Sequence, residues 1–117
     1  MFTDYLKNYI KNSESEGKEK HVPFILATDC SSCGEIGVTI KVGKEIFHPS
    51  TPEHYIQYVE LFGINKDDKL VFLTKFILSK ENTIPYLKTH IKKGVFKKLL
   101  ALSSCNIHGL WEREIEI

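Results

Sequence analysis

The chain has 117 residues, of which 42% are hydrophobic and 26% are charged, and its formal net charge is +1. This composition is that of one soluble globular domain, and the balanced charge excludes a global attraction to nucleic acid or to an anionic membrane. No apolar run approaches the roughly 18 residues of a membrane span, and the N-terminus lacks the apolar region of a signal peptide, so we expect a cytoplasmic protein.

The first 20 residues are expected to differ from the rest of the chain. Apolar residues recur at helical spacing in 2–10, which predicts a short amphipathic helix that packs on the domain or on a partner. Residues 11–20 contain no hydrophobic side chain and are predicted to form a solvated loop.

From Val22 onward the sequence has the alternation of β-strands. Apolar, β-branched and aromatic residues gather in short segments separated by polar or proline-containing turns. The predicted strands are residues 22–28, 36–42, 55–62, 70–78, 87–92, 96–105 and 111–117. Seven short strands at this spacing predict an all-β sandwich or barrel.

Five residues of metal-ligand type fall at predicted strand ends or in loops. The three cysteines are an odd number in a chain without an export signal, which favours metal or redox use over a disulfide framework. A Pro-containing loop, 48–54, has a histidine at each end, which limits the freedom of both imidazoles. The candidate ligands are His21, His48, His54, Cys105 and His108.

This donor set leaves several metals open. One thiolate with several imidazoles suits zinc, copper or iron, but five candidates with a single thiolate fit a redox metal better than structural zinc. A blue-copper site needs a weak axial ligand, often methionine, and the only methionine is Met1. A cupredoxin-like electron carrier or metal-binding sandwich without turnover stays the alternative to an enzyme. A structural domain that binds zinc is the third hypothesis.

Three further features lie outside this set of donors. Cys30 and Cys33 form a C-x-x-C pair that suits a redox pair, a regulatory disulfide or half of an intersubunit metal site, and two free thiols in a turn are an equal alternative. His90 alternates with polar neighbours and is expected to face solvent. Trp111 is expected to pack beside the loop that carries Cys105 and His108.

Three segments together carry a resemblance to a known family. The segments GKEKHVP (17–23), VGKEIFHPSTPEHYI (42–56) and LSSCNIHGLWE (102–112) resemble the superoxide reductases, the neelaredoxin and desulfoferrodoxin iron proteins. The resemblance implies an immunoglobulin-like seven-stranded β-sandwich in residues 17–117, preceded by an extension, 1–16. No cysteine precedes Cys30, so the chain resembles the type with one iron and no four-cysteine centre.

The resemblance also implies a mononuclear non-haem iron site, one per chain. By motif position, Cys105 would be the axial ligand, Glu19 would fill the sixth position of ferric iron, and Lys20 would attract the substrate. The four equatorial ligands would be His21, His48, His54 and His108.

The activity implied is the one-electron reduction of superoxide to hydrogen peroxide. Because superoxide is an anion, a lysine beside the open position raises the rate of encounter. Backbone N–H groups of Ile107 and His108 are expected to donate to the sulfur of Cys105 and to tune the metal. The resemblance further implies an electron donor such as rubredoxin and a homo-oligomer, a dimer or tetramer.

Overall fold

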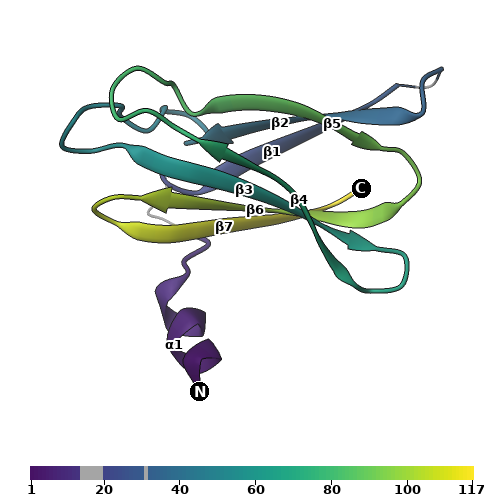
Figure 1. Ribbon diagram of the computed structural model, residues 1–117, viewed down its shortest axis with the longest axis horizontal. Coiled ribbons are helices and arrows are strands. Elements are labelled where there is room, and N and C mark those ends of the chain that lie inside the picture. The colour runs from purple at the N-terminus through teal and green to yellow at the C-terminus, as the bar shows by residue number, and fades with distance from the viewer. Residues whose placement is uncertain (14–19, 31) are drawn as a thin grey trace.

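Seven strands and one helix form in the structure, a computed structural model that describes residues 1–13, 20–30 and 32–117 (Figure 1). Each predicted strand is present, with its ends shifted by up to three residues. The elements are α1 (Phe2–Tyr9), β1 (Pro23–Asp29), β2 (Glu35–Val42), β3 (Ile56–Asn65), β4 (Leu70–Ile77), β5 (Tyr86–Lys92), β6 (Phe96–Cys105) and β7 (Gly109–Glu116).

The strands form two antiparallel sheets stacked in two layers. One sheet has the order β1-β2-β5 and the other has the order β4-β3-β6-β7. The layers are visible edge-on in Figure 1, with β2 and β5 in the upper layer and β6 and β7 in the lower one. The prediction of an immunoglobulin-like seven-stranded β-sandwich is confirmed.

The core lies between the two sheets and is almost entirely aliphatic. Alternate residues of β2, β3 and β6 point inward, as the period-2 pattern of the sequence predicts. The buried cluster consists of Ile25, Val38, Ile40, Val42, Ile56, Val59, Leu61, Leu78, Ile91, Leu99, Ala101 and Cys105. Because Cys105 closes this cluster, its thiol lies where the core meets the loops at one end.

Strand β3 is longer than predicted. Its sequence-based end was Phe62, but pairing with β6 continues to Asn65. Gly63 permits this, because a Cβ atom there would lie 2.5 Å from the ring of Phe96. A glycine inside a strand weakens a sequence prediction, whereas here it provides room for a neighbouring aromatic ring.

Helix α1 extends away from the sandwich (Figure 1). None of its eight residues, all of which are described, is buried, and Phe2 and Tyr5 are 73% and 76% exposed. The helix is therefore present as predicted, and most of its apolar face is exposed, but the ring of Tyr9 at its C-terminal end lies against Gly109 of the β6–β7 turn. No helix in the described ranges is long and apolar enough to cross a membrane.

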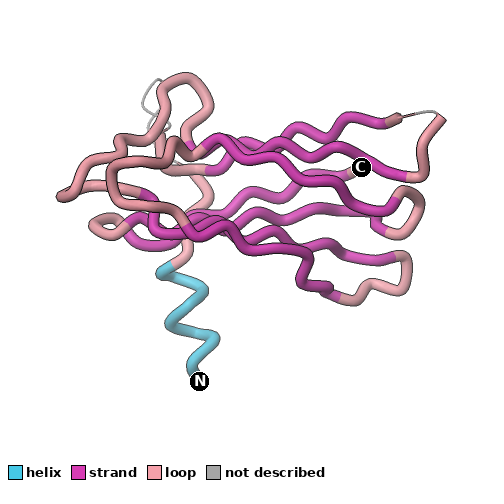
Figure 2. Tube along the Cα trace, turned by 45° about the horizontal axis from the view of Figure 1, so that its top comes forward, coloured by secondary structure: helices cyan, strands magenta, loops and turns pink. Residues whose placement is uncertain are grey.

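The loops that carry the candidate ligands gather at one end of the sandwich (Figure 2). Strand β1 begins at this end, β6 ends there, and the long connection from β2 to β3 crosses it. Antiparallel pairing therefore brings together segments from positions 21, 48–54 and 105–108.

Candidate metal centre

His21 is fixed just before the first strand by contacts with the opposite sheet. The hydroxyl of Ser103, a fully buried residue of β6, donates to the backbone carbonyl of His21 at 3.1 Å. The ring of Trp111 is stacked on the imidazole, with centroids 4.9 Å apart and planes at 19°. Ser103 was missed from the sequence, where its only signal is a small polar residue at an inward position of β6.

Side-chain donor atoms from distant segments converge on one point. One donor atom from each of His21, His48, His54 and Cys105 lies within 4.8 Å of all the others. The Nδ1 atom of His108 lies 3.0 Å from Nε2 of His21 and 3.2 Å from Nε2 of His54. Two nitrogen donors bound at right angles, each about 2.1 Å from one ion, would lie about 3.0 Å apart. All five predicted ligands are thus brought together, at a spacing that fits one metal ion.

The four imidazoles form a ring in the order His21, His48, His54, His108. Successive ring centroids are 4.8, 4.4, 5.0 and 4.7 Å apart, and each successive pair is steeply inclined, between 69° and 77°. The diagonal from His21 to His54 is longer, 5.9 Å. In a regular tetrahedron all pairs would be equally spaced. The imidazoles therefore surround a flattened site, with Cys105 as a fifth donor.

His48 is held in the tautomer that a metal requires. Its Nδ1 donates to the carbonyl of Pro49 at 2.8 Å, which leaves Nε2 without a proton. This buried Nε2 has no hydrogen-bond partner among the described residues. Burial, opposed in part by the bond to Pro49, lowers the pKa of His48 to about 4. A buried, neutral nitrogen without a partner fits a metal ligand.

His54 is held by its own loop and by the loop that carries His108. Its backbone N–H donates to Oγ1 of Thr51 at 3.0 Å. The Asn106 side chain accepts from the N–H of Tyr55 at 2.9 Å and donates to the carbonyl of Glu53 at 3.0 Å. Burial and the neighbouring His108 lower the pKa of His54, so this imidazole also favours its neutral form. Asn106 was missed as a positioning residue, although it lies between two predicted ligands.

Cys105 and His108 share one tight turn between β6 and β7. The backbone N–H of His108 lies 3.4 Å from Sγ of Cys105, as predicted for a donor that tunes the sulfur. The Nδ1 of His108 is 3.7 Å from the same sulfur. Gly109, at φ 81°, allows the chain to re-enter β7 in a conformation that other residues rarely adopt.

Trp111 covers the site from the side of β7, as predicted. It is buried, and its Nε1 donates to the carbonyl of His108 at 3.2 Å. The prediction that residues 11–20 form only a solvated loop was wrong for Lys11. Its backbone pairs with β7 through Leu110 and Glu112, and its ammonium lies 5.1 Å from the Trp111 ring. A lysine can do this because its apolar stem covers a ring while its charge stays in water.

Four other residues were assigned positions or roles from the sequence, and the three that the structure describes lie differently with respect to the imidazoles. Lys20 is half-buried, and its charge is one of those that lower the pKa of His48 and of His54, so it lies near the imidazoles. Glu19 lies outside the described residues. His90 is exposed, as predicted, and contacts Glu35 at 3.3 Å. Met1, which directly precedes α1, is 91% exposed, so it does not supply the axial ligand of a blue-copper site.

Cys30 and Cys33 form a disulfide, and Cys105 is a free thiol. The alternative of two free thiols in the turn is therefore wrong. The pair lies in the turn between β1 and β2, at the end of the sandwich opposite the imidazoles (Figure 1). It takes no part in the metal centre.

The family model for desulfoferrodoxin matches residues 13–114. The chain belongs to the desulfoferrodoxin family. The superoxide reductase of Pyrococcus abyssi is 40% identical to this family member, and the alignment covers 96% of this chain and 98% of that protein. The matched range includes all five converging donors.

Solved structures agree with this family membership. A crystal structure of superoxide reductase in the oxidised state has a TM-score of 0.83 and 31% identity, and covers 96% of this chain and 98% of its own. A putative superoxide reductase from Thermotoga maritima has a TM-score of 0.78 and 31% identity, covering 96% and 95%. The similarity thus extends over the whole family fold.

Proposed function

We propose that this protein is a superoxide reductase, which converts superoxide, one electron and two protons into hydrogen peroxide. The observation that carries the proposal is the convergence of four imidazoles and one thiol on a single point, in a chain of the desulfoferrodoxin family. A structural zinc site would use four donors at tetrahedral spacing. A flattened set of five donors fits a redox metal with an open position.

We propose iron as the metal, one ion per chain. When bound, iron supplies the electron that superoxide takes up. The orphaned Nε2 of His48 and the closely spaced Nε2 and Nδ1 atoms of its neighbours support this assignment. The proposed ligands are His21, His48, His54, His108 and Cys105.

The groups around the metal would act on charge and water. The ammonium of Lys20 attracts the superoxide anion, and its influence on two imidazoles supports a position near the open side. Trp111 keeps water from the His21 side by stacking on that ring. The His108 N–H stabilises negative charge on the Cys105 sulfur. We assign Glu19 to the open position of the oxidised site, as its place in the E-K-H motif suggests.

Partners complete the proposal. A small electron-carrier protein such as rubredoxin would restore the reduced metal, because the chain has no second metal site among its described residues.

We also propose a homo-oligomer, a dimer or tetramer, that covers the exposed apolar face of α1. Light scattering of the Phe2→Ser/Tyr5→Ser variant tests this, and an unchanged mass would contradict a role for α1. The cytoplasmic location and the boundary between 1–16 and 17–117 stay predictions.

The function is tested by metal content, spectrum and turnover. Protein loaded with iron is expected to contain one iron per chain, to be blue to grey when oxidised and to bleach on reduction. Pulse radiolysis of the reduced protein should give a second-order reaction with superoxide that the apo-protein lacks. Cys105→Ser should lose the visible band and most of the rate, because the thiolate is absent. Equal rates for the iron-loaded and metal-free protein would sink the enzyme assignment.

A further inference from the structure

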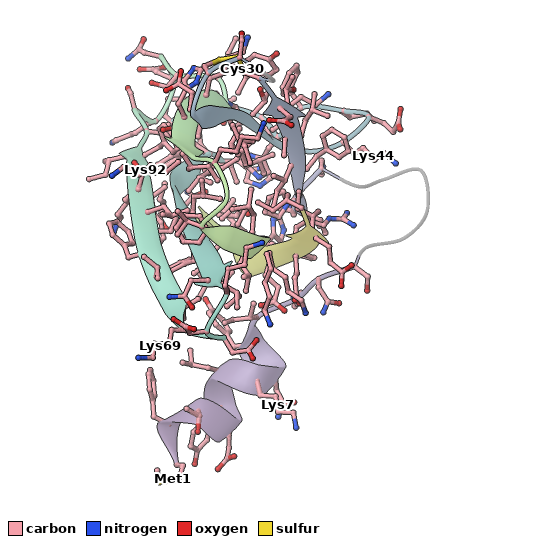
Figure 3. All side chains as sticks on the ribbon, turned by 90° about the vertical axis from the view of Figure 1, so that its right-hand side faces the viewer. Met1, Lys7, Cys30, Lys44, Lys69 and Lys92 are labelled. Carbon is pink, nitrogen blue, oxygen red and sulfur yellow. A yellow bond between two sulfur atoms is a disulfide. The ribbon has the colours of Figure 1, made fainter. Side chains whose placement is uncertain are left out.

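The Cys30–Cys33 disulfide lies far from the metal centre and has no assigned role. It occupies the turn after β1, whereas His21 precedes that strand, and Figure 3 shows the disulfide beside the labelled Cys30 at the rim of the molecule. Seven residues of extended strand separate the two ends, roughly 23 Å of chain. Any chemistry of this pair is therefore spatially independent of the iron ligands.

The disulfide contributes little to holding the fold together. It joins residues three apart in sequence, and the entropy that a disulfide removes from the unfolded chain grows with the length of the loop it closes. The flanking strands already pair in register up to Asp29 and Ile36. The ladder brings the two strands together without the bridge, and the short loop places the contribution of the bridge at the low end of the range for disulfides.

The two sulfurs differ in accessibility and surroundings. Cys33 is exposed, whereas Cys30 is half-buried, and its Sγ lies 3.8 Å from the hydroxyl of Ser32. The ammonium of Lys93 contacts the carbonyl of Cys30 at 3.4 Å and Oδ1 of Asp29 at 3.0 Å. The hydroxyl of Ser32 favours a thiolate at Cys30, and the Lys93 ammonium, although paired with Asp29, is the cation held against the Cys30 backbone. The exposed sulfur is thus open to attack, and the other is the better leaving group.

A cavity lies against the disulfide and gives room for a reactant. Its volume is about 410 Å³, and it extends along the outer face of β2 and β5. The absence of a side chain at Gly37, opposite His90 in the ladder, keeps it open. Its lining includes both cysteines, Lys88, His90 and Glu35. A thiol-bearing side chain or small molecule can therefore approach the two sulfurs through a cavity lined by both basic and acidic residues.

We propose that Cys30 and Cys33 form a thiol–disulfide exchange site, a second redox site that takes two electrons from a dithiol reductant. A thiolate of the reductant attacks Sγ of Cys33, a new S–S bond forms, and the electron pair of the old bond leaves on Cys30. The second thiolate of the reductant then attacks the reductant sulfur that is bonded to Cys33. This closes the disulfide of the reductant and releases the thiolate of Cys33. The reductant leaves as a disulfide, and its two protons pass to the cysteines.

The test uses the full-length, metal-loaded protein in buffers of reduced and oxidised dithiothreitol at increasing ratios, without denaturant. After an acid quench and alkylation, peptide masses report the state of each cysteine. Cys30 and Cys33 should pass together from disulfide to dithiol while the metal content and circular dichroism stay constant. A pair that stays oxidised at every ratio, or that is reduced only as the protein unfolds, would overturn the proposal.

Two further measurements test the order of events. With reduced glutathione as the probe, the trapped mixed disulfide should map to Cys33, and mapping to Cys30 would reverse the assignment. Lys93→Gln should slow the reduction several-fold, whereas Lys92→Gln removes the same charge one residue earlier and should leave the rate unchanged. Equal effects would exclude Lys93 as the group that favours Cys30 as the leaving thiolate.

A stability measurement separates this role from a structural one. The Cys30→Ser/Cys33→Ser variant should lower the unfolding midpoint by no more than about 10 °C, since a loop this short accounts for at most about 2 kcal/mol. A much larger drop would identify the bridge as structural and contradict the proposal. All of these readouts are independent of superoxide turnover, so failure of the iron assignment and failure of the exchange site are distinguishable.

Discussion

The side-chain amide of Asn106 brackets His54 by binding the backbone on both sides of it. The oxygen accepts from Tyr55 and the nitrogen donates to Glu53, at 2.9 and 3.0 Å. The backbone N–H of Asn106 also donates to the carbonyl of Tyr55 at 3.2 Å. One residue thus fixes the distance between the loop that carries His54 and the turn that carries Cys105 and His108.

Replacing Asn106 should weaken metal binding more than it weakens the fold. Residues that orient metal ligands typically contribute about 10-fold to 100-fold in affinity, and we expect a loss in the lower part of that range for Asn106→Ala. Competition with a chelator during metal titration measures it. Asn82→Ala, which removes an exposed amide bound to Ser79, is the matched control. Equal metal affinities in the two variants would show that the hydrogen bonds of the Asn106 side chain do not position His54.

The Trp111 side chain should contribute to stability through two separable contacts. Trp111→Phe keeps an aromatic ring over His21 but loses the N–H donor to His108, and should cost about 1 kcal/mol in the free energy of unfolding. Trp111→Leu also loses the stack and should cost about 3 kcal/mol. Urea unfolding of the metal-free proteins checks both values. A leucine variant no weaker than the phenylalanine one would contradict a contribution from the stack.

The metal-free protein should lose stability on mild acidification. The pKa of His48 is lowered by burial from 6.5 to about 4, so the unfolded chain binds more protons between these values. The free energy of unfolding therefore falls as the pH decreases through this window, by on the order of 2–3 kcal/mol for this residue. The lowered pKa of His54 acts in the same direction.

Urea unfolding at several pH values between roughly 7 and 4 measures how the free energy of unfolding depends on pH. This range covers the titration of the His48 imidazole in the unfolded and folded states. His48→Gln keeps a polar side chain of similar length without a titrating ring, and its profile should be flatter. A His48→Gln profile as steep as that of the parent would assign the acid sensitivity to other groups.

Lys20 should affect the encounter with superoxide rather than the metal itself. A unit charge about 6 Å from an anion in water contributes about 0.7 kcal/mol, which is about threefold in rate. Lys20→Gln should therefore slow the second-order reaction by about this factor and flatten its dependence on ionic strength. Lys69→Gln removes the same charge from the turn after β3, at the opposite end of the sandwich, and is the control that should leave the rate unchanged. A spectrum altered by Lys20→Gln would indicate a structural role instead.

Most of the strands and all five converging donors were predictable from the sequence. The alternation in 36–42 and 96–105 marks half-buried strands, because side chains on a strand point to opposite faces. The four histidines and Cys105 stand at strand ends or in the loops between strands, where functional sites usually form. The end of β3 was not predictable, because the space beside Gly63 depends on the ring of Phe96 from another strand.

The sequence by itself determined the strand pattern and which residues can bind a metal, since both depend on local side-chain chemistry and period. Only the tertiary structure decided how those residues are held. The two hydrogen bonds of Asn106 around His54, the bond of Ser103 to His21 and the pairing of Lys11 with β7 join residues that are 51 to 100 positions apart. Such contacts arise from the pairing and stacking of sheets, and the local sequence pattern does not determine which residues they join.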